Sequence, residues 1–221
     1  MRLMGEFGAV MAKEAAKRLG DSQVDTARRL VAFLKKYGGP ESLPSLRDLQ
    51  SGEDDRLRSD ALDARLALGD AEALPDLRAA LHSPIDRESQ TAIRLAGQHR
   101  VVGTTAELAR MIKIGGFLGG CNRRNEDLVR ALGKIGDPVV LPTLKKAVRR
   151  RSLFYPGERR DLKAAIFESL DGYPRESLAG MLRLGAKSRD PRIRAACHSL
   201  QKDAAGIEIS PRASRPESGG R

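Results

Sequence analysis

One short pattern recurs along this chain at nearly constant spacing, and it restricts the fold more than any other feature. The pattern is a leucine followed by proline or alanine, with a second apolar residue three positions after the first. Its copies begin at Leu43, Leu74, Leu108, Leu141 and Leu178, so the spacings are 31, 34, 33 and 37 residues. Repeats of about 20–50 residues are typical of solenoids, because each unit buries its apolar face against the next. The chain is therefore expected to fold as a stack of similar units.

Each unit is long enough for two short helices. Apolar residues recur at spacings of three and four upstream of each copy, as in Leu128, Val129 and Leu132, and this is the period of an amphipathic helix. A glycine turn then separates the two helices, because glycine tolerates the left-handed conformation after a helix C-cap. These turns are expected at Gly69, Gly103 and Gly136, with Gly38 to Pro40 and Gly172 to Pro174 in the outer units.

The fourth unit also resembles a known repeat. Its segment Leu128 to Leu144 reads Leu-Val-Arg-Ala-Leu-Gly-Lys-Ile-Gly-Asp-Pro-Val-Val-Leu-Pro-Thr-Leu. This segment resembles the HEAT repeat of short bacterial type, similar to the repeats of phycobilisome bilin lyases. The resemblance covers about residues 22–202 and departs in the third unit, where Gly97 lies eleven positions before Leu108. The corresponding glycine of the fourth unit, Gly133, lies eight positions before Leu141.

The resemblance implies an all-α fold, an α-solenoid of antiparallel helix pairs with about five HEAT-like repeats. We expect an N-terminal helix in residues 1–21, the solenoid in 22–203 and a disordered tail in 204–221. Composition agrees with this fold class. The 221 residues include no Trp, 3 Tyr and 5 Phe, which argues against an all-β protein because aromatic residues favour strands.

No segment is apolar enough to cross a membrane. The longest stretch without a charge, 114–122, is nine residues, whereas a membrane helix needs about 20. The two cysteines are too few for a disulfide framework, and no secretory signal is visible. The expected compartment is the cytoplasm.

The residue types that carry catalysis or metal binding are scarce. The three histidines, His82, His99 and His198, belong to different units, and no zinc-ligand spacing is present. Cys197 is expected to be a small buried side chain. Cys121 has no base placed near it by the sequence, which makes it a weak nucleophile candidate. We therefore predict no catalytic, cofactor-binding or metal-binding residues, and a protein that is not an enzyme.

Positive charge is concentrated in the second half of the chain. Residues 1–114 carry 18 Lys and Arg against 17 Asp and Glu, a net charge of +1, whereas residues 115–221 carry 22 against 12, a net charge of +10. The second helices of the third to fifth units contribute cations that we expect to share one face. We predict that this face contacts a partner through Arg110, Lys113, Lys146, Arg149, Arg150 and Arg183.

These features indicate a non-catalytic scaffold or adaptor that presents a concave, partly basic groove to an acidic protein segment. One alternative is a nucleic-acid-binding module that contacts phosphates, whose affinity would depend steeply on salt. A second alternative, implied by the resemblance, is a bilin-lyase-like protein that handles a chromophore. Solvated helix faces that have no partner would produce the same charge pattern.

Overall fold

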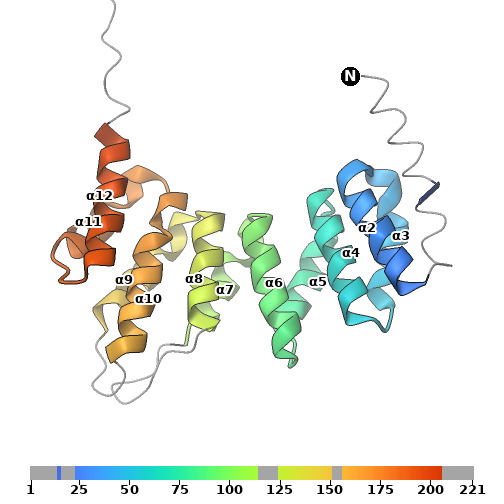
Figure 1. Ribbon diagram of the computed structural model, residues 1–221, viewed down its shortest axis with the longest axis horizontal. Helices are drawn as coiled ribbons and strands as arrows, with labels where there is room; N and C mark the ends of the chain where they lie inside the picture. The colour runs from blue at the N-terminus through green and yellow to red at the C-terminus, as the bar shows by residue number, and fades with distance from the viewer. Residues whose placement is uncertain (1–13, 16–22, 114–123, 151–155, 206–221) are drawn as a thin grey trace, which may run out of the picture.

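The predicted all-α solenoid is present. The structure is a computed structural model, and it describes residues 14–15, 23–113, 124–150 and 156–205 (Figure 1). No strand occurs within these ranges. The first helix of each pair is long: α2 (Val24–Tyr37), α4 (Asp55–Ala67), α6 (Asp86–Gln98), α8 (Arg124–Ile135), α10 (Pro156–Glu168) and the final helix α12 (Pro191–Ala205). The second helices are shorter: α3 (Leu43–Asp48), α5 (Ala73–Leu81), α7 (Thr105–Met111), α9 (Leu141–Arg149) and α11 (Ala179–Ala186).

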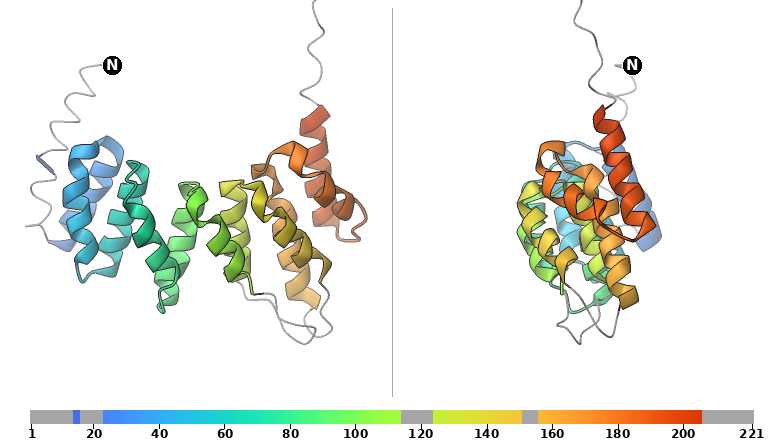
Figure 2. Two further views of the ribbon diagram at one scale, coloured as in Figure 1. Left: turned by 180° about the vertical axis from the view of Figure 1, so that it is seen from behind. Right: turned by 90° about the vertical axis from the view of Figure 1, so that its left-hand side faces the viewer.

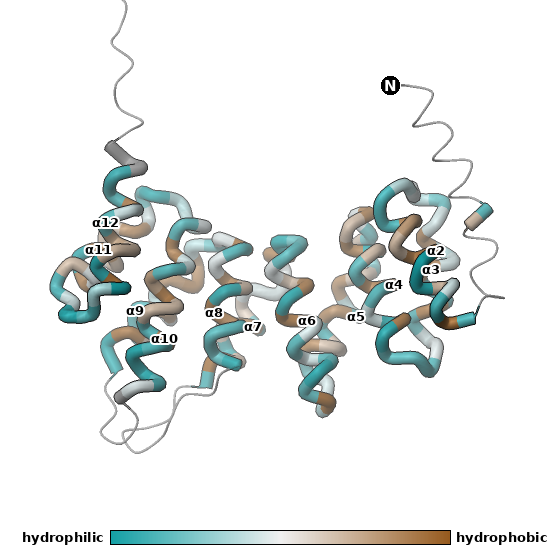
Figure 3. The backbone as a smooth tube through the Cα atoms, in the orientation of Figure 1, coloured by the Kyte–Doolittle hydropathy of each residue, from teal (hydrophilic) through white to brown (hydrophobic). Residues whose placement is uncertain are grey.

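The helices form two layers. In the first-helix layer, α2, α4, α6, α8, α10 and α12 pack one on the next along the whole stack. In the second-helix layer, each helix packs chiefly on first helices rather than on the neighbouring second helices. Figure 2 shows the same stack from behind and from one end. Apolar and polar segments alternate along each helix in Figure 3, as expected for helices that bury one face.

Short 3-10 segments and prolines open several second helices. The segments Pro40–Ser42, Val102–Thr104 and Pro138–Val140 directly precede α3, α7 and α9. Pro44 and Pro142 occupy the first turns of α3 and α9, where a missing N–H costs little. Asp54 caps α4 by accepting a hydrogen bond from the Leu57 N–H.

The turn of the third unit differs from the sequence expectation. Gly69 and Gly136 have positive φ angles as predicted, but in the third unit the residue with positive φ, at 50°, is Arg100 rather than Gly103. The N–H groups of Arg100 and Val101 bond to carbonyls three and five residues back, as those of Gly69 and Asp70 do. The third unit therefore makes the same helix-ending motif with an arginine in the glycine position.

This turn moves the register of the third unit by three residues. Helix α7 begins at Thr105, five residues after Arg100, and α9 begins at Leu141, five residues after Gly136. Leu108 consequently matches Leu144, although the sequence pattern had paired it with Leu141. The repeated pattern misled because an apolar residue stands at both positions in the other units, as Leu74 and Leu77 do.

The core is divided into two clusters. The larger runs from α4 to α12, and the smaller joins α2, α3 and the opposite side of α4. The two apolar residues of each copy of the repeated pattern are expected to be buried between units, and Leu77, Leu141 and Leu144 are buried. Leu74 is only partly buried, at a site beside Gly103.

Two other sequence predictions meet the structure at its edges. Cys197 is buried as predicted, and burial raises the pKa of its thiol. Helix α12 extends to Ala205, and the predicted tail beyond it lies outside the described residues. Of the N-terminal helix expected in residues 1–21, only Glu14 and Ala15 are described, and both are helical.

Candidate binding groove

Two hollows flank α6 on the first-helix layer. The first lies between α6 and the pair α2 and α4, with a volume of about 410 Å³. The second lies between α6 and α8, with a volume of about 370 Å³. Arg87, Thr91 and Arg94 of α6 line both hollows. They stand at positions i, i+4 and i+7, so they share one helix face. We call these two hollows together the α6 groove.

Residues of three neighbouring helices complete the walls. The α2 and α4 side consists of Arg28, Asp55, Arg56, Ser59, Asp60 and Asp63. The α8 side consists of Asp127, Arg130, Ala131 and Lys134. Ile85 and Glu88, at the start of α6, complete the first hollow. The side chain of Ile85 is 48% exposed, which makes it an apolar contact point beside charged groups.

The carboxylates on the α4 wall already have cationic partners. Arg28 donates to Asp60 at 2.6 Å, and Lys35 donates to Asp63 at 2.7 Å. His99 Nε2 also lies 2.7 Å from an oxygen of Asp63. Burial alone would raise the pKa of the Asp63 carboxyl, but the hydrogen bonds from Lys35 and His99 lower it below its ordinary value. Asp63 therefore remains charged at neutral pH and ties α4 to both α2 and the end of α6.

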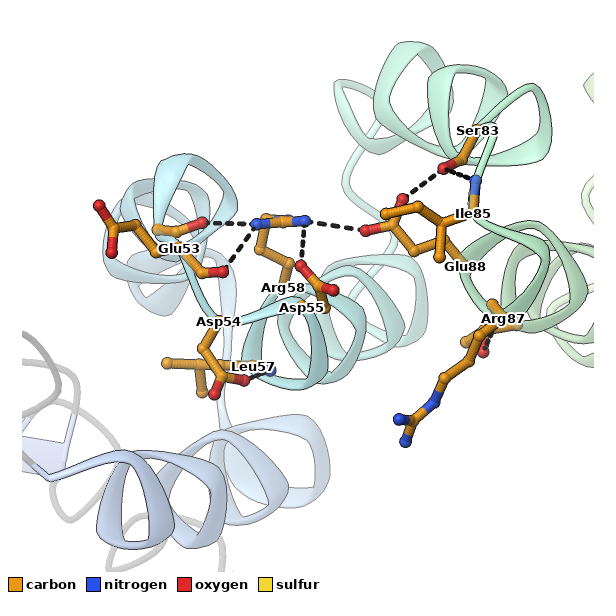
Figure 4. Close-up of polar contacts among 11 residues, drawn as sticks. Glu53, Asp54, Asp55, Leu57, Arg58, Ser83, Ile85, Arg87 and Glu88 are labelled. Atoms are coloured by element: carbon orange, nitrogen blue, oxygen red, sulfur yellow. Dashed lines mark hydrogen bonds and ion pairs between the residues drawn. The ribbon is translucent and has the colours of Figure 1, made fainter.

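Arg58 is the cationic partner of Asp55 on α4 and of Glu88 on α6, the two other carboxylates of the first hollow. Its NH2 group donates to Asp55 at 2.6 Å and to Glu88 at 2.8 Å (Figure 4). Glu88 also accepts a hydrogen bond from Ser83. The Ser83 hydroxyl is the main cause that lowers the pKa of Glu88, burial acts in the opposite direction, and Arg58 lowers this pKa further. This cluster bridges the two helices that border the first hollow.

The α8 wall has the same arrangement. Arg130 donates to Asp127 at 3.2 Å and to Glu126 at 3.0 Å, within one helix. Exposed pairs of this kind contribute little to stability, on the order of 0.3–0.5 kcal/mol. Their relevance here is that Asp127 is also compensated. Each carboxylate that lines the α6 groove thus has a cationic neighbour.

Several cations of the groove have no carboxylate partner. The side chains of Arg56, Arg87 and Lys134 make no hydrogen bond or ion pair with any described residue. Arg94 donates only to the amide oxygen of Gln98, at 3.0 Å. In Figure 4 the side chain of Arg87 points away from the Arg58 cluster. The positive charge available in the groove therefore exceeds the negative charge.

The six residues predicted from sequence lie elsewhere. Arg110, Lys113, Lys146, Arg149, Arg150 and Arg183 are all exposed. They lie on or directly after α7, α9 and α11, in the second-helix layer, and none lines either hollow of the α6 groove. The structure therefore separates these six residues from the α6 groove, and their role in partner binding stays a prediction.

The structure also changes which of these six residues match. Arg110, Lys146 and Arg183 each follow a buried apolar residue of their helix by two positions: Leu108, Leu144 and Met181. Lys113 follows Leu108 by five positions, as Arg149 follows Leu144, but Lys113 lies beyond the end of α7. Counting from the start of the repeated pattern, at Leu108 and Leu141, would instead pair Lys113 with Lys146. The cause is the shifted register of α7.

Sequence reasoning did not select Arg56, Arg87 or Arg94. A signal was present in the spacing of Arg87, Thr91 and Arg94, which marks a polar helix face. Acidic neighbours such as Asp86 and Glu88 hid this face, because the total charge of the first half is close to zero.

Among the described residues, no group of three His, Cys, Asp or Glu could hold a metal ion. No helix in the described ranges is long and apolar enough to cross a membrane.

Comparison with known proteins agrees with this geometry at one helix pair. Residues 126–150 match the family model of the PBS lyase HEAT-like repeat, and they correspond to α8, the turn at Gly136 and α9. Residues 126–150 of this chain thus form a HEAT-like repeat. No curated protein matches the sequence of the chain. Among solved structures, the chain is similar to human deoxyhypusine hydroxylase in complex with glycerol, at 13% identity and a TM-score of 0.34 over 93% of this chain and 100% of that one.

Proposed function

We propose that this protein is a non-catalytic scaffold whose α6 groove binds an acidic segment of a partner protein. The supporting observation is the charge balance of the groove. Its carboxylates are already compensated, whereas Arg56, Arg87 and Arg94 have no carboxylate partner. Guanidinium groups form their strongest hydrogen bonds with carboxylates, so these three side chains favour an acidic ligand.

The spacing of the arginines constrains the ligand. Arg87 and Arg94 are seven residues apart on one helix, which corresponds to about 10 Å along its axis. In an extended peptide of the polyproline II type, which has three residues per turn and a rise of about 3.1 Å, carboxylates three positions apart share one face and lie about 9 Å apart. The exposed Ile85 lies just before Arg87, so it favours an apolar side chain beside the carboxylate that Arg87 binds. The preferred ligand is therefore an extended segment with acidic residues at every third position and apolar residues next to them.

A designed peptide tests this proposal. The probe is a fluorescein-labelled peptide of repeated Glu-Leu-Ser triplets, and its control contains Lys in place of Glu. We expect fluorescence anisotropy to detect binding of the Glu peptide alone. Arg87→Glu combined with Arg94→Glu should weaken this binding about tenfold or more, because each charge-assisted hydrogen bond contributes about 1.5–3 kcal/mol.

The matched control lies on the second-helix layer. Arg110→Glu combined with Arg183→Glu changes the net charge by the same amount without touching the groove. This control should retain the affinity of the parent protein for the Glu peptide. Equal binding by the parent and the groove variant would overturn the proposal.

The bilin-handling alternative receives less support from the groove. Neither hollow has a histidine or cysteine among its lining residues, and those residue types are the ones that attach or protonate a chromophore. An unchanged absorbance spectrum of biliverdin after mixing with the protein is the expected result. A shifted spectrum that Arg87→Glu abolishes would favour the alternative.

A further inference from the structure

The second-helix layer has a different charge pattern from the groove. Helices α7, α9 and α11 have the sequences TAELARM, LPTLKKAVR and AGMLRLGA. Together they contain a single carboxylate, Glu107, and that residue already pairs with Arg78 of α5 at 3.4 Å. By contrast, α3 and α5 each contain an aspartate, Asp48 and Asp76. Each of α3, α5 and α7 thus contains one carboxylate and one arginine, and a net positive charge within the helices is found in α9 and α11.

The cations of these helices are aligned from unit to unit. Arg110, Lys146 and Arg183 occupy matched positions on α7, α9 and α11, Arg149 lies one turn beyond Lys146 on α9, and Lys113 follows the end of α7. All five are exposed, and none of their side chains makes a hydrogen bond or ion pair with a described residue. We call these five residues the basic strip.

The form of the strip indicates its ligand. We infer that the basic strip binds the phosphate backbone of a nucleic acid, independently of the α6 groove. Phosphate contacts require exposed, adaptable cations in a row rather than a pocket, and duplex DNA presents one negative charge per about 1.7 Å of its axis. None of the strip residues lines a hollow of the groove, and all five are exposed, so the strip presents its charge on an open surface.

The same helices predict how such binding would discriminate between nucleic acids. Helices α7, α9 and α11 contain no aromatic residue, so they provide no platform on which bases could stack. Binding should therefore be insensitive to base sequence. Its affinity should fall with salt, since each neutralised phosphate contributes about −0.9 to the slope of log K against log salt concentration.

Two variants of equal charge separate the strip from the net charge of the protein. The strip variant combines Arg110→Glu, Lys146→Glu and Arg183→Glu. The groove variant combines Arg56→Glu, Arg87→Glu and Arg94→Glu. Each lowers the formal net charge of +11 by the same amount. All six side chains are exposed, and circular dichroism verifies that both variants fold.

The measurement is binding of a labelled duplex DNA of mixed sequence across a salt series. We expect the strip variant to lose tenfold or more in affinity for the DNA at low salt. The slope of log K against log salt concentration should become shallower by about three. The groove variant should keep most of the parent's affinity and most of its salt dependence. If the strip variant misfolds, Arg110→Gln, Lys146→Gln and Arg183→Gln provide the same comparison without reversed charges.

Three results would overturn the inference. The parent could fail to bind duplex DNA at low salt, or the two variants could lose equal affinity for DNA. The strip variant could also lose its affinity for the Glu peptide while it still binds DNA. The last result would identify the strip as a protein-binding surface. Failure of the groove proposal would appear only in the peptide assay, so the two claims remain distinguishable.

Discussion

The contacts that join α2, α4 and α6 differ from those that join α6, α8 and α10, although ion pairs also occur further on, as between Asp161 of α10 and Arg192 of α12. Between α2 and α6, charged side chains cross from one unit to the next, as in Lys35 with Asp63 and Arg58 with Glu88. Between α6 and α10, glycines allow close backbone approach: a Cβ on Gly97 would lie 2.8 Å from Ala131 Cα, and a Cβ on Gly133 would lie 2.7 Å from the Ser169 carbonyl oxygen. Similar helix pairs can thus be joined by ion pairs or by tight apolar contact.

The α6 groove lies where these two kinds of contact meet. On one side of α6, Glu88 pairs with Arg58 and His99 pairs with Asp63, both residues of α4. On the other side, α6 packs closely on α8 at Gly97. The carboxylates of the ion-paired side are already engaged, which leaves the arginines of α6 available. The charge balance of the groove therefore follows from the way the repeats are joined.

The largest predicted effect is at the buried ion pair of the N-terminal units. Arg65 is 2% exposed and donates to Asp70 at 2.8 Å and to Asp76 at 2.5 Å. Arg65→Met should lower the free energy of unfolding by about 3 kcal/mol, because the buried Asp70 carboxylate then loses one of its two arginine partners and keeps only Arg47. Urea titration measures this loss. Arg56→Met, on the exposed face of the same helix, should change it by less than about 0.5 kcal/mol.

An intermediate effect is predicted at the glycine contacts of the C-terminal units. Gly133→Ala would place a Cβ 2.6 Å from Ser169 Cβ, a distance that real Cβ atoms do not show, so the backbone must shift. The expected cost is about 1–3 kcal/mol, again measured from the urea midpoint. Gly157→Ala is the control, since nothing lies within 4 Å of the added carbon. Equal effects of both substitutions would refute the tight contact.

The smallest of these effects is the response to acid, and it should be confined to the N-terminal units. The pKa of Asp70 is lowered by hydrogen bonds from Arg47 and Arg65, and the pKa values of Asp63 and Glu88 are lowered as well. A carboxylate with a lowered pKa stabilises the fold above its unfolded pKa of about 4, and this stabilisation disappears as the pH falls further.

Amide hydrogen exchange resolves this response by helix. Protection factors of α2 to α5 should decline between about pH 4 and pH 3, while those of α8 and α9 remain closer to their neutral values. An equal decline in both groups would mean that the two halves do not differ in the forces that join them.

The fold could be predicted from the sequence because its signal is repeated. Leucines at matched positions, glycines at Gly69 and Gly136 and prolines in first helical turns all describe the same helix pair. The third unit could not be aligned, because Arg100 replaces the glycine and a non-glycine residue with positive φ is not visible in a sequence. That single residue shifted the register of α7 and with it the match of Lys113.

The α6 groove was beyond sequence reasoning for a different reason. Whether Arg87 or Arg94 is available depends on which carboxylates other arginines have already engaged. Those pairs join residues far apart in the chain, as in Arg58 with Glu88, which are thirty positions apart. Net charge summed over the chain cannot reveal such pairing. Net charge indicates the second half of the chain, and the six contact residues predicted there lie on the second-helix layer.

The central claim is that acidic ligands bind at α6, and hydrogen exchange with and without the Glu-Leu-Ser peptide tests it most directly. The account predicts that saturating peptide increases protection in α4 and α6, residues 55–67 and 86–98, and leaves α9 and α11 unchanged. Protection confined to α9 and α11, residues 141–149 and 179–186, would contradict it, because the acidic ligand would then occupy the second-helix layer.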